Sequence, residues 1–155
     1  MENGLLPNSA ITASSVFGTS KHGAWLARLN NVPNGAFWGS WSADLNEAGQ
    51  WLQIDLGEER LLTNFATQGR PSSAQWVKSY TILFSSDSVK WEEYKENGVV
   101  KVCNAFFLSG ISQATRHVTL PVSYDLSVTA RGYLFVRFFD AMFLSFIVLH
   151  NYYVK

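Results

Sequence analysis

The sequence contains very little cysteine and no long apolar run, and each of these absences excludes some kinds of structure. Cys103 is the only cysteine among the 155 residues, so an intrachain disulfide and a metal site built from several thiolates are both excluded. We expect Cys103 to be a small buried side chain beside Phe106 and Phe107. The longest apolar stretch, residues 141–149, is too short to span a bilayer as a helix.

An excess of basic charge and a signal-peptide pattern are also missing. Twelve Lys and Arg residues balance 12 Asp and Glu residues, whereas a nucleic-acid binder needs a basic surface to neutralise phosphates. We therefore expect no nucleic-acid partner. Residues 1–4 are neither basic nor followed by an apolar run, so this chain shows no signal peptide. It is expected to be either intracellular or a mature part of a secreted protein.

What the sequence does contain is typical of one well-packed β domain, which we expect to span residues 1–155. Hydrophobic residues make up 47% of the chain and aromatic residues 15%. Leu52, Ile54 and Leu56 alternate with polar residues, which indicates a strand with one buried face. The segments expected to be strands are residues 11–14, 50–57, 61–67, 76–84, 91–94, 99–102, 104–108, 116–122, 133–139 and 143–153. Short strands at such regular spacing predict a β-sandwich or barrel.

Turn signals separate these strands. Gly57 with two glutamates predicts a turn between strands 50–57 and 61–67, and Asn97-Gly98 predicts a hairpin. Residues 25–29 suggest one irregular helical turn. Three loops, residues 16–24, 30–42 and 68–76, have the polar and aromatic composition of binding loops. We expect the indole rings in and beside these loops, apart from that of Trp38, to pack into the barrel end: Trp25, Trp41 and Trp76.

No catalytic pattern emerges. The three histidines are far apart and show no metal-ligand spacing, and the carboxylates are scattered along the chain. Neither a nucleophile-elbow pattern nor a phosphate-binding loop occurs. We therefore expect no enzymatic activity, no cofactor and no metal site.

Several stretches resemble the discoidin domain, the C-type domain of coagulation factors five and eight. The resemblance rests on Gln-Trp-Leu-Gln-Ile-Asp-Leu-Gly at residues 50–57, Ala-Thr-Gln-Gly-Arg at residues 66–70, and the elements at residues 25–29 and 41–44. It covers essentially residues 3–102, and the last third matches less well. The family's terminal disulfide has no counterpart in this chain.

The resemblance implies an eight-stranded antiparallel jelly-roll barrel with ligand-binding loops, called spikes, at one end. Members of the family bind cell surfaces, some by inserting apolar spike residues into phosphatidylserine membranes and others by binding collagen, receptors or glycans. Transferred by position, the spikes are residues 17–23, 31–40 and 70–75. The residues expected to contact a ligand are Phe17, Lys21, His22, Asn34, Phe37, Trp38, Arg70 and Gln75, with Phe37 or Trp38 as the stacking platform.

The spikes favour one ligand class. The third spike has no bulky apolar residue and the first has only Phe17, so membrane insertion would be weak. We therefore expect a non-catalytic adhesion module that binds a cell-surface glycan or an extracellular protein. An anionic membrane surface is the alternative partner. A third hypothesis is an enzyme, or a module that targets an enzyme to a polysaccharide. The expected location is extracellular or at the cell surface, as part of a larger protein.

Overall fold

The computed structural model describes residues 6–18, 20–70, 73, 75–104, 119–142 and 148–153. Within these ranges the chain forms strands joined by loops and three short 3₁₀ turns. In chain order the elements are η1 (Asn8–Ala10), β1 (Ile11–Ala13), η2 (Ser20–His22), η3 (Ala24–Leu26), β2 (Trp51–Gln68), β3 (Trp76–Ser85), β4 (Glu92–Glu93), β5 (Lys95–Glu96), β6 (Val99–Val100), β7 (Cys103–Asn104), β8 (Thr119–Met142) and β9 (Val148–Tyr153). No helix in the described part of the chain is long and apolar enough to cross a membrane.

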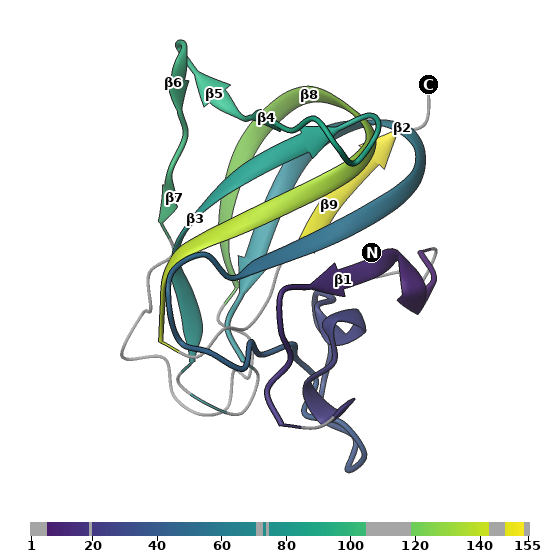
Figure 1. Ribbon diagram of the computed structural model, residues 1–155, viewed down its shortest axis with the longest axis vertical. Coiled ribbons are helices and arrows are strands. Elements are labelled where there is room, and N and C mark those ends of the chain that lie inside the picture. The colour runs from purple at the N-terminus through teal and green to yellow at the C-terminus, as the bar shows by residue number, and fades with distance from the viewer. Residues whose placement is uncertain are drawn as a thin grey trace.

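One curled antiparallel sheet dominates the molecule (Figure 1). Its strand order is β1-β2-β8-β3-β4, with β7 added to β3 and β9 added to β2, while β5 and β6 form a separate hairpin. The long strands β2 and β8 lie at the centre of this order and pair over most of their length. The all-β antiparallel architecture predicted from the alternating sequence is therefore confirmed.

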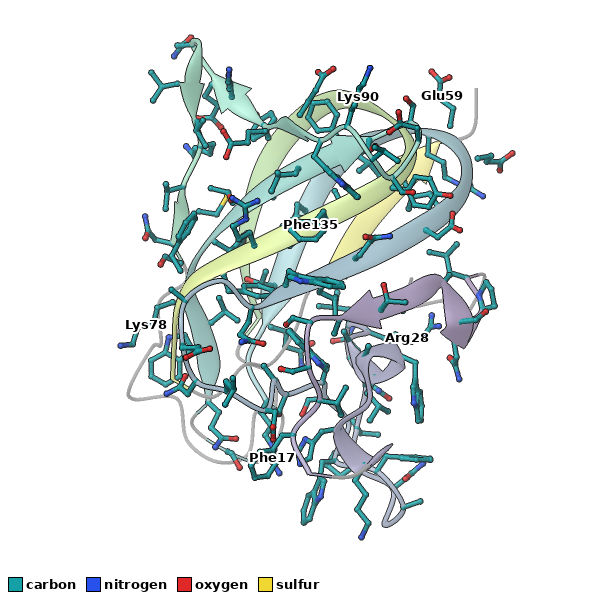
Figure 2. All side chains as sticks on the ribbon, viewed as in Figure 1. Phe17, Arg28, Glu59, Lys78, Lys90 and Phe135 are labelled. Atoms are coloured by element: carbon teal, nitrogen blue, oxygen red, sulfur yellow. The ribbon has the colours of Figure 1, made fainter. Side chains whose placement is uncertain are left out.

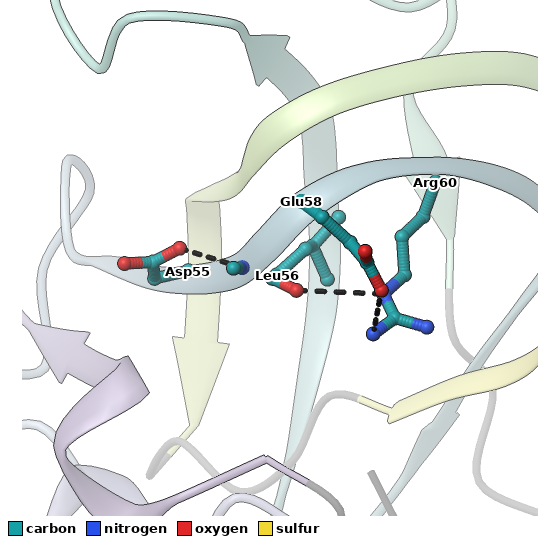
Figure 3. A network of polar contacts seen from close by, with 5 residues as sticks. Asp55, Leu56, Glu58 and Arg60 are labelled. Carbon is teal, nitrogen blue, oxygen red and sulfur yellow. Dashed lines mark hydrogen bonds and ion pairs between the residues drawn. The ribbon is translucent and has the colours of Figure 1, made fainter. Parts of the chain in front are cut away.

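The predicted turn at Gly57 is wrong, because β2 runs on from Trp51 to Gln68. The register against β8 shifts between Asp55 and Glu59, and Gly57 has a positive φ of 75° at this irregularity. The carboxylate of Asp55 accepts a hydrogen bond of 2.8 Å from the Gly57 backbone N–H (Figure 3). A β-bulge of this kind bends a strand without ending it.

Several other predicted boundaries change as well. Residues 116–122 and 133–139 were predicted as separate strands, but from Thr119 they belong to the single strand β8. The predicted strands 91–94 and 99–102 shrink to the two-residue β4 and β6. The hairpin at Asn97-Gly98 is confirmed, with φ angles of 51° and 80°. Outside the described residues lie most of the predicted strand 104–108, the start of the predicted strand 116–122 and residues 143–147 of the last strand.

The core fills the concave side of the sheet. Leu52, Ile54 and Leu56 are at most 1% exposed, as their alternation predicts, and they pack in one cluster with Tyr80 of β3. Cys103 is fully buried in the same cluster, which confirms the prediction for its side chain. Phe106 and Phe107, its expected neighbours, lie outside the described residues.

Trp41 joins the N-terminal loops to this core. Its side chain is completely buried, its ring lies 5.7 Å from that of Phe138 on β8, and its indole N–H donates to the Ser15 carbonyl at 2.9 Å. In Figure 1 the segment after β1 that carries η2 and η3 lies at the lower end of the molecule, while β1 itself pairs with β2 as an edge strand of the sheet. A rigid anchor of this kind positions the loops that precede β2.

Candidate functional site

Side chains from three loops meet around Trp38 at one end of the molecule. The His22 ring lies 5.7 Å from Phe17, edge to face, and 6.3 Å from Trp38, nearly parallel to it. The guanidinium carbon of Arg70 lies over the Trp38 ring, 5.2 Å from its centroid. Figure 2 shows Phe17 at the lower end of the molecule, opposite Glu59 and Lys90. We call Phe17, His22, Trp38 and Arg70 the Trp38 cluster.

Trp38 is the largest ring that this cluster presents to solvent, beside the smaller ring of Phe17. Its side chain is 45% exposed, whereas Trp41, three residues later, is buried. The Trp38 backbone N–H donates to the Lys21 carbonyl at 3.2 Å, which ties the second loop to the first. The Gln68 side chain accepts from the Asn30 backbone N–H at 2.9 Å and ties the second loop to the end of β2. An exposed indole held by these contacts can stack against a flat ligand surface.

Gly39 allows the second loop to fold back on itself. Its φ is +72°, and a side-chain carbon placed there would lie 2.7 Å from the Val32 carbonyl carbon and 2.8 Å from the Pro33 nitrogen. Only glycine fits a positive φ and so close a backbone approach together. The turn that positions Trp38 therefore requires glycine at position 39.

Arg70 is held in place and keeps part of its hydrogen-bonding capacity unused. Its Nη1 donates to the Gln75 side-chain oxygen at 2.7 Å, and its backbone N–H donates to the Gln75 carbonyl at 2.9 Å. Its Nε is buried and has no hydrogen-bond partner within the described part of the chain, and no carboxylate there forms an ion pair with the guanidinium. Partial burial lowers the pKa of Arg70, but an arginine remains charged. The result is a positioned cation beside an aromatic face.

His22 lies beneath this surface. It is 6% exposed, and its Nδ1 lies 3.2 Å from the Ser42 hydroxyl. Burial and then the positive charge of Arg70 lower the pKa of His22, while a hydrogen bond with the Ser40 backbone opposes that shift. His22 is therefore neutral at pH 7 and supports the rings of Phe17 and Trp38 from within.

Phe17 and Lys21 lie at the surface of the first loop. The Phe17 side chain is 48% exposed, and Lys21 is exposed as well. The backbone N–H of Phe17 donates to the Ser42 carbonyl at 2.8 Å, which fixes the base of the loop. Together with Trp38 they give this end of the molecule two accessible rings and a flexible cation.

Asn34 and Phe37 have contacts of their own within the second loop. The Asn34 side-chain oxygen accepts from the backbone N–H groups of Ala36 and Phe37 at 3.2 and 3.0 Å, which closes a tight turn. The Phe37 ring packs edge to face on Trp25 at 4.6 Å and is partly buried. Of the two predicted platforms, Trp38 therefore offers the more exposed ring.

Sequence reasoning did not identify two residues that support the site, Gly39 and Ser42. Gly39 follows an aromatic residue in a glycine-containing loop, but the Val32 backbone that requires it is visible only in three dimensions. Ser42 lies within residues 41–44, one of the stretches that resemble the family, and its contact with His22 depends on packing. In the described residues, no three His, Cys, Asp or Glu side chains gather closely enough to hold a metal ion.

Comparisons with known proteins agree with this architecture. The model of the F5/8 type C domain matches residues 10–138. Lactadherin of Rattus norvegicus is 38% identical over 106 residues, which cover 66% of this chain and 25% of that protein, so the chain spans about a quarter of that relative.

Solved structures with low sequence identity share the jelly-roll fold. Discoidin II from Dictyostelium discoideum superposes with a TM-score of 0.76 at 22% identity, over 99% of this chain and 57% of that one. The carbohydrate-binding module CpGH89CBM32-5 from Clostridium perfringens, solved with GalNAc-β-1,3-galactose, gives a TM-score of 0.60 at 13% identity, over 96% and 99% of the two chains. The predicted jelly-roll class is confirmed, and the chain belongs to the F5/8 type C, or discoidin, domain family.

Proposed function

We propose that residues 1–155 form one non-catalytic recognition domain that binds a glycan or an extracellular protein through the Trp38 cluster. The observation that carries the proposal is the Arg70 guanidinium, held 5.2 Å from the centroid of an indole ring that is 45% exposed. A sugar ring can stack on the open part of the indole while its hydroxyls accept hydrogen bonds from the guanidinium. The same pair can bind an aromatic or acidic side chain of a protein.

The site also has the rigidity that recognition requires. The Trp38 backbone is tied to the first loop through Lys21, and the Arg70 backbone is tied to Gln75 within its own loop, so binding would order few additional groups. The carbohydrate complex among the structural neighbours supports a saccharide as the first ligand to test. We infer a location outside the cell or at its surface, as one part of a larger protein, in keeping with the matched segment of lactadherin.

A glycan array probed with the wild-type chain and two variants tests this function. We expect Trp38→Ala and Arg70→Ala each to weaken binding about tenfold, because each removes a contact of about 1–2 kcal/mol. Val89→Ala, at a 77% exposed position outside the cluster, is the control and should bind normally. Unchanged binding by both folded cluster variants would contradict the assignment of the site.

An anionic membrane is the second candidate ligand, because Phe17 is 48% exposed beside the exposed cation Lys21. Insertion of one phenylalanine contributes about 2–3 kcal/mol, and one lysine near an anionic surface adds about 1 kcal/mol. Co-sedimentation with phosphatidylserine vesicles distinguishes this candidate. Binding that is lost in Phe17→Ser and retained in Arg70→Ala would favour the membrane over the glycan.

A further inference from the structure

A row of three aromatic rings crosses the outer face of the sheet, outside the Trp38 cluster. Trp51 of β2 stacks on Phe135 of β8 with centroids 5.3 Å apart, and Trp91, just before β4, lies 5.1 Å from the same Phe135 ring. All three side chains are partly exposed. Figure 2 shows Phe135 on β8, across the middle of the sheet rather than at the end that carries Phe17. The row therefore forms a surface separate from the loops.

A groove opens beside this row. Its volume is about 620 Å³, and its lining residues are Leu83, Trp91, Glu92, Glu93, Lys95 and Arg137. Leu83 pairs with both Phe135 and Glu93 in the strand ladders, so the groove lies at the β4 edge of the main sheet, where β4 pairs with β3. The groove shares no residue with the Trp38 cluster.

The groove carries equal numbers of positive and negative side chains. Glu92 and Glu93 supply two carboxylates, while Lys95 and Arg137 supply two cations. None of the ion pairs found in the described residues involves these four side chains. A carboxylate only accepts hydrogen bonds and these cations only donate them, so the groove offers both kinds of group next to an indole ring.

This combination selects among ligand classes. An anion would meet two carboxylates and a cation would meet two positive groups, so either is repelled by half of the set. An apolar ligand would displace water from four charged groups and offer no hydrogen bonds in its place, which is unfavourable. A neutral sugar fits, because every hydroxyl both donates and accepts and the pyranose ring can stack on Trp91.

We propose that this groove is a second saccharide-binding site, which takes a neutral oligosaccharide stacked on Trp91 and hydrogen-bonded to Arg137 and Glu92. The site is independent of the function proposed for the Trp38 cluster, and either can be disproved while the other stands. With both present, the domain would hold one glycan at its loop end and a second along its sheet face.

Fluorine NMR of the chain labelled with 5-fluorotryptophan separates the two sites in one measurement. The chain has six tryptophans, whose resonances are assigned from single Trp→Phe variants. The probes are four neutral hexasaccharides: cellohexaose, xylohexaose, mannohexaose and β-1,4-galactohexaose. We expect at least one of them to shift the Trp91 resonance saturably and the Trp51 resonance less, both in the wild-type chain and in Trp38→Ala.

Two further variants decide whether the groove causes that shift. Arg137→Gln should weaken the Trp91 titration about tenfold, because a hydrogen bond from a charged donor is lost. Arg137 is exposed, so this variant is expected to fold. Phe139→Ala is the control, since it removes a 44% exposed ring from the same strand and Phe139 is not one of the residues that line the groove. The proposal is overturned if no probe shifts Trp91 saturably, if Trp38→Ala abolishes the shift, or if Arg137→Gln leaves it unchanged.

Discussion

Trp38 and Trp41 lie three positions apart and have opposite environments, 45% exposed and fully buried. The sequence predicted that Trp41 packs into the barrel end and that Trp38 faces a ligand. The exposed fractions of the two side chains agree with this division, and ligand contact by Trp38 stays a prediction. His22 was predicted as a ligand contact, which remains untested. It lies almost fully buried, because Ser42 and the Ser40 backbone replace the water that an imidazole would otherwise need. A neighbour twenty residues away cannot be identified from local composition.

His22 should make the stability of the domain depend on pH. Its pKa in the folded chain lies below the ordinary value of 6.5, so the unfolded chain binds the proton first as the pH falls. The free energy of unfolding therefore decreases as the pH drops below about 6.5, until the folded-state pKa is reached. Urea denaturation between pH 7.5 and 5 measures the effect.

The control for that measurement is His22→Asn, which removes the titrating group from the same buried position. It should lower stability at all pH values and flatten the decrease over this window. An equally steep decrease in the variant would show that another group is responsible.

At the scale of elements, local signals identified most strands and misjudged where they end. Gly57 followed by two glutamates fits either a hairpin turn or a bulge, and the ladder to β8 decides for the bulge. The Asn97-Gly98 turn was predictable because its φ angles depend on the two residues themselves. Turns that depend on their own residues were therefore predicted correctly. The continuation of β2 through Gly57 was not, because it depends on pairing with β8.

The second loop allows a matched comparison of two glycines. Gly39→Ala should lower the free energy of unfolding by about 2–4 kcal/mol, since it adds a backbone clash to the strain of a positive φ. Gly35→Ala, at φ +84° with no atom within 4 Å of the new side chain, should lose only about 1 kcal/mol. Chemical denaturation measures both variants, and equal losses would contradict the clash.

Across the whole molecule, a few buried contacts join the loop end to the sheet. Trp41 makes one of them by packing on Phe138 of β8, and its indole hydrogen bond to Ser15 ties the second loop to the segment just before the first loop. The all-β class followed from alternation along the chain, whereas the meeting of three distant loops around Trp38 depends on this junction. For that reason the separate loops could be predicted from the sequence, but not their contacts.

Substitutions at Trp41 test the junction. Trp41→Phe keeps most of the packing and should lose about 1–2 kcal/mol with the hydrogen bond to Ser15. Trp41→Ala leaves a cavity in the core and should lose about 3–5 kcal/mol. Thermal unfolding ranks the two variants. An alanine variant as stable as the wild-type chain would mean that the loops are held by other contacts.

The pairing of β2 with β8 also bears on how the chain reaches this structure. Residues 51–68 must find residues 119–142, and the ladder joins Trp51 to Arg137 and Gln68 to Thr119. Each such pair closes a long loop, and the entropy cost of closing it must be met before the contacts stabilise the structure. Domains with so high a contact order fold in about milliseconds to seconds. This one should therefore expose the unpaired edges of two long strands throughout a slow search, and dilute refolding conditions should improve its recovery.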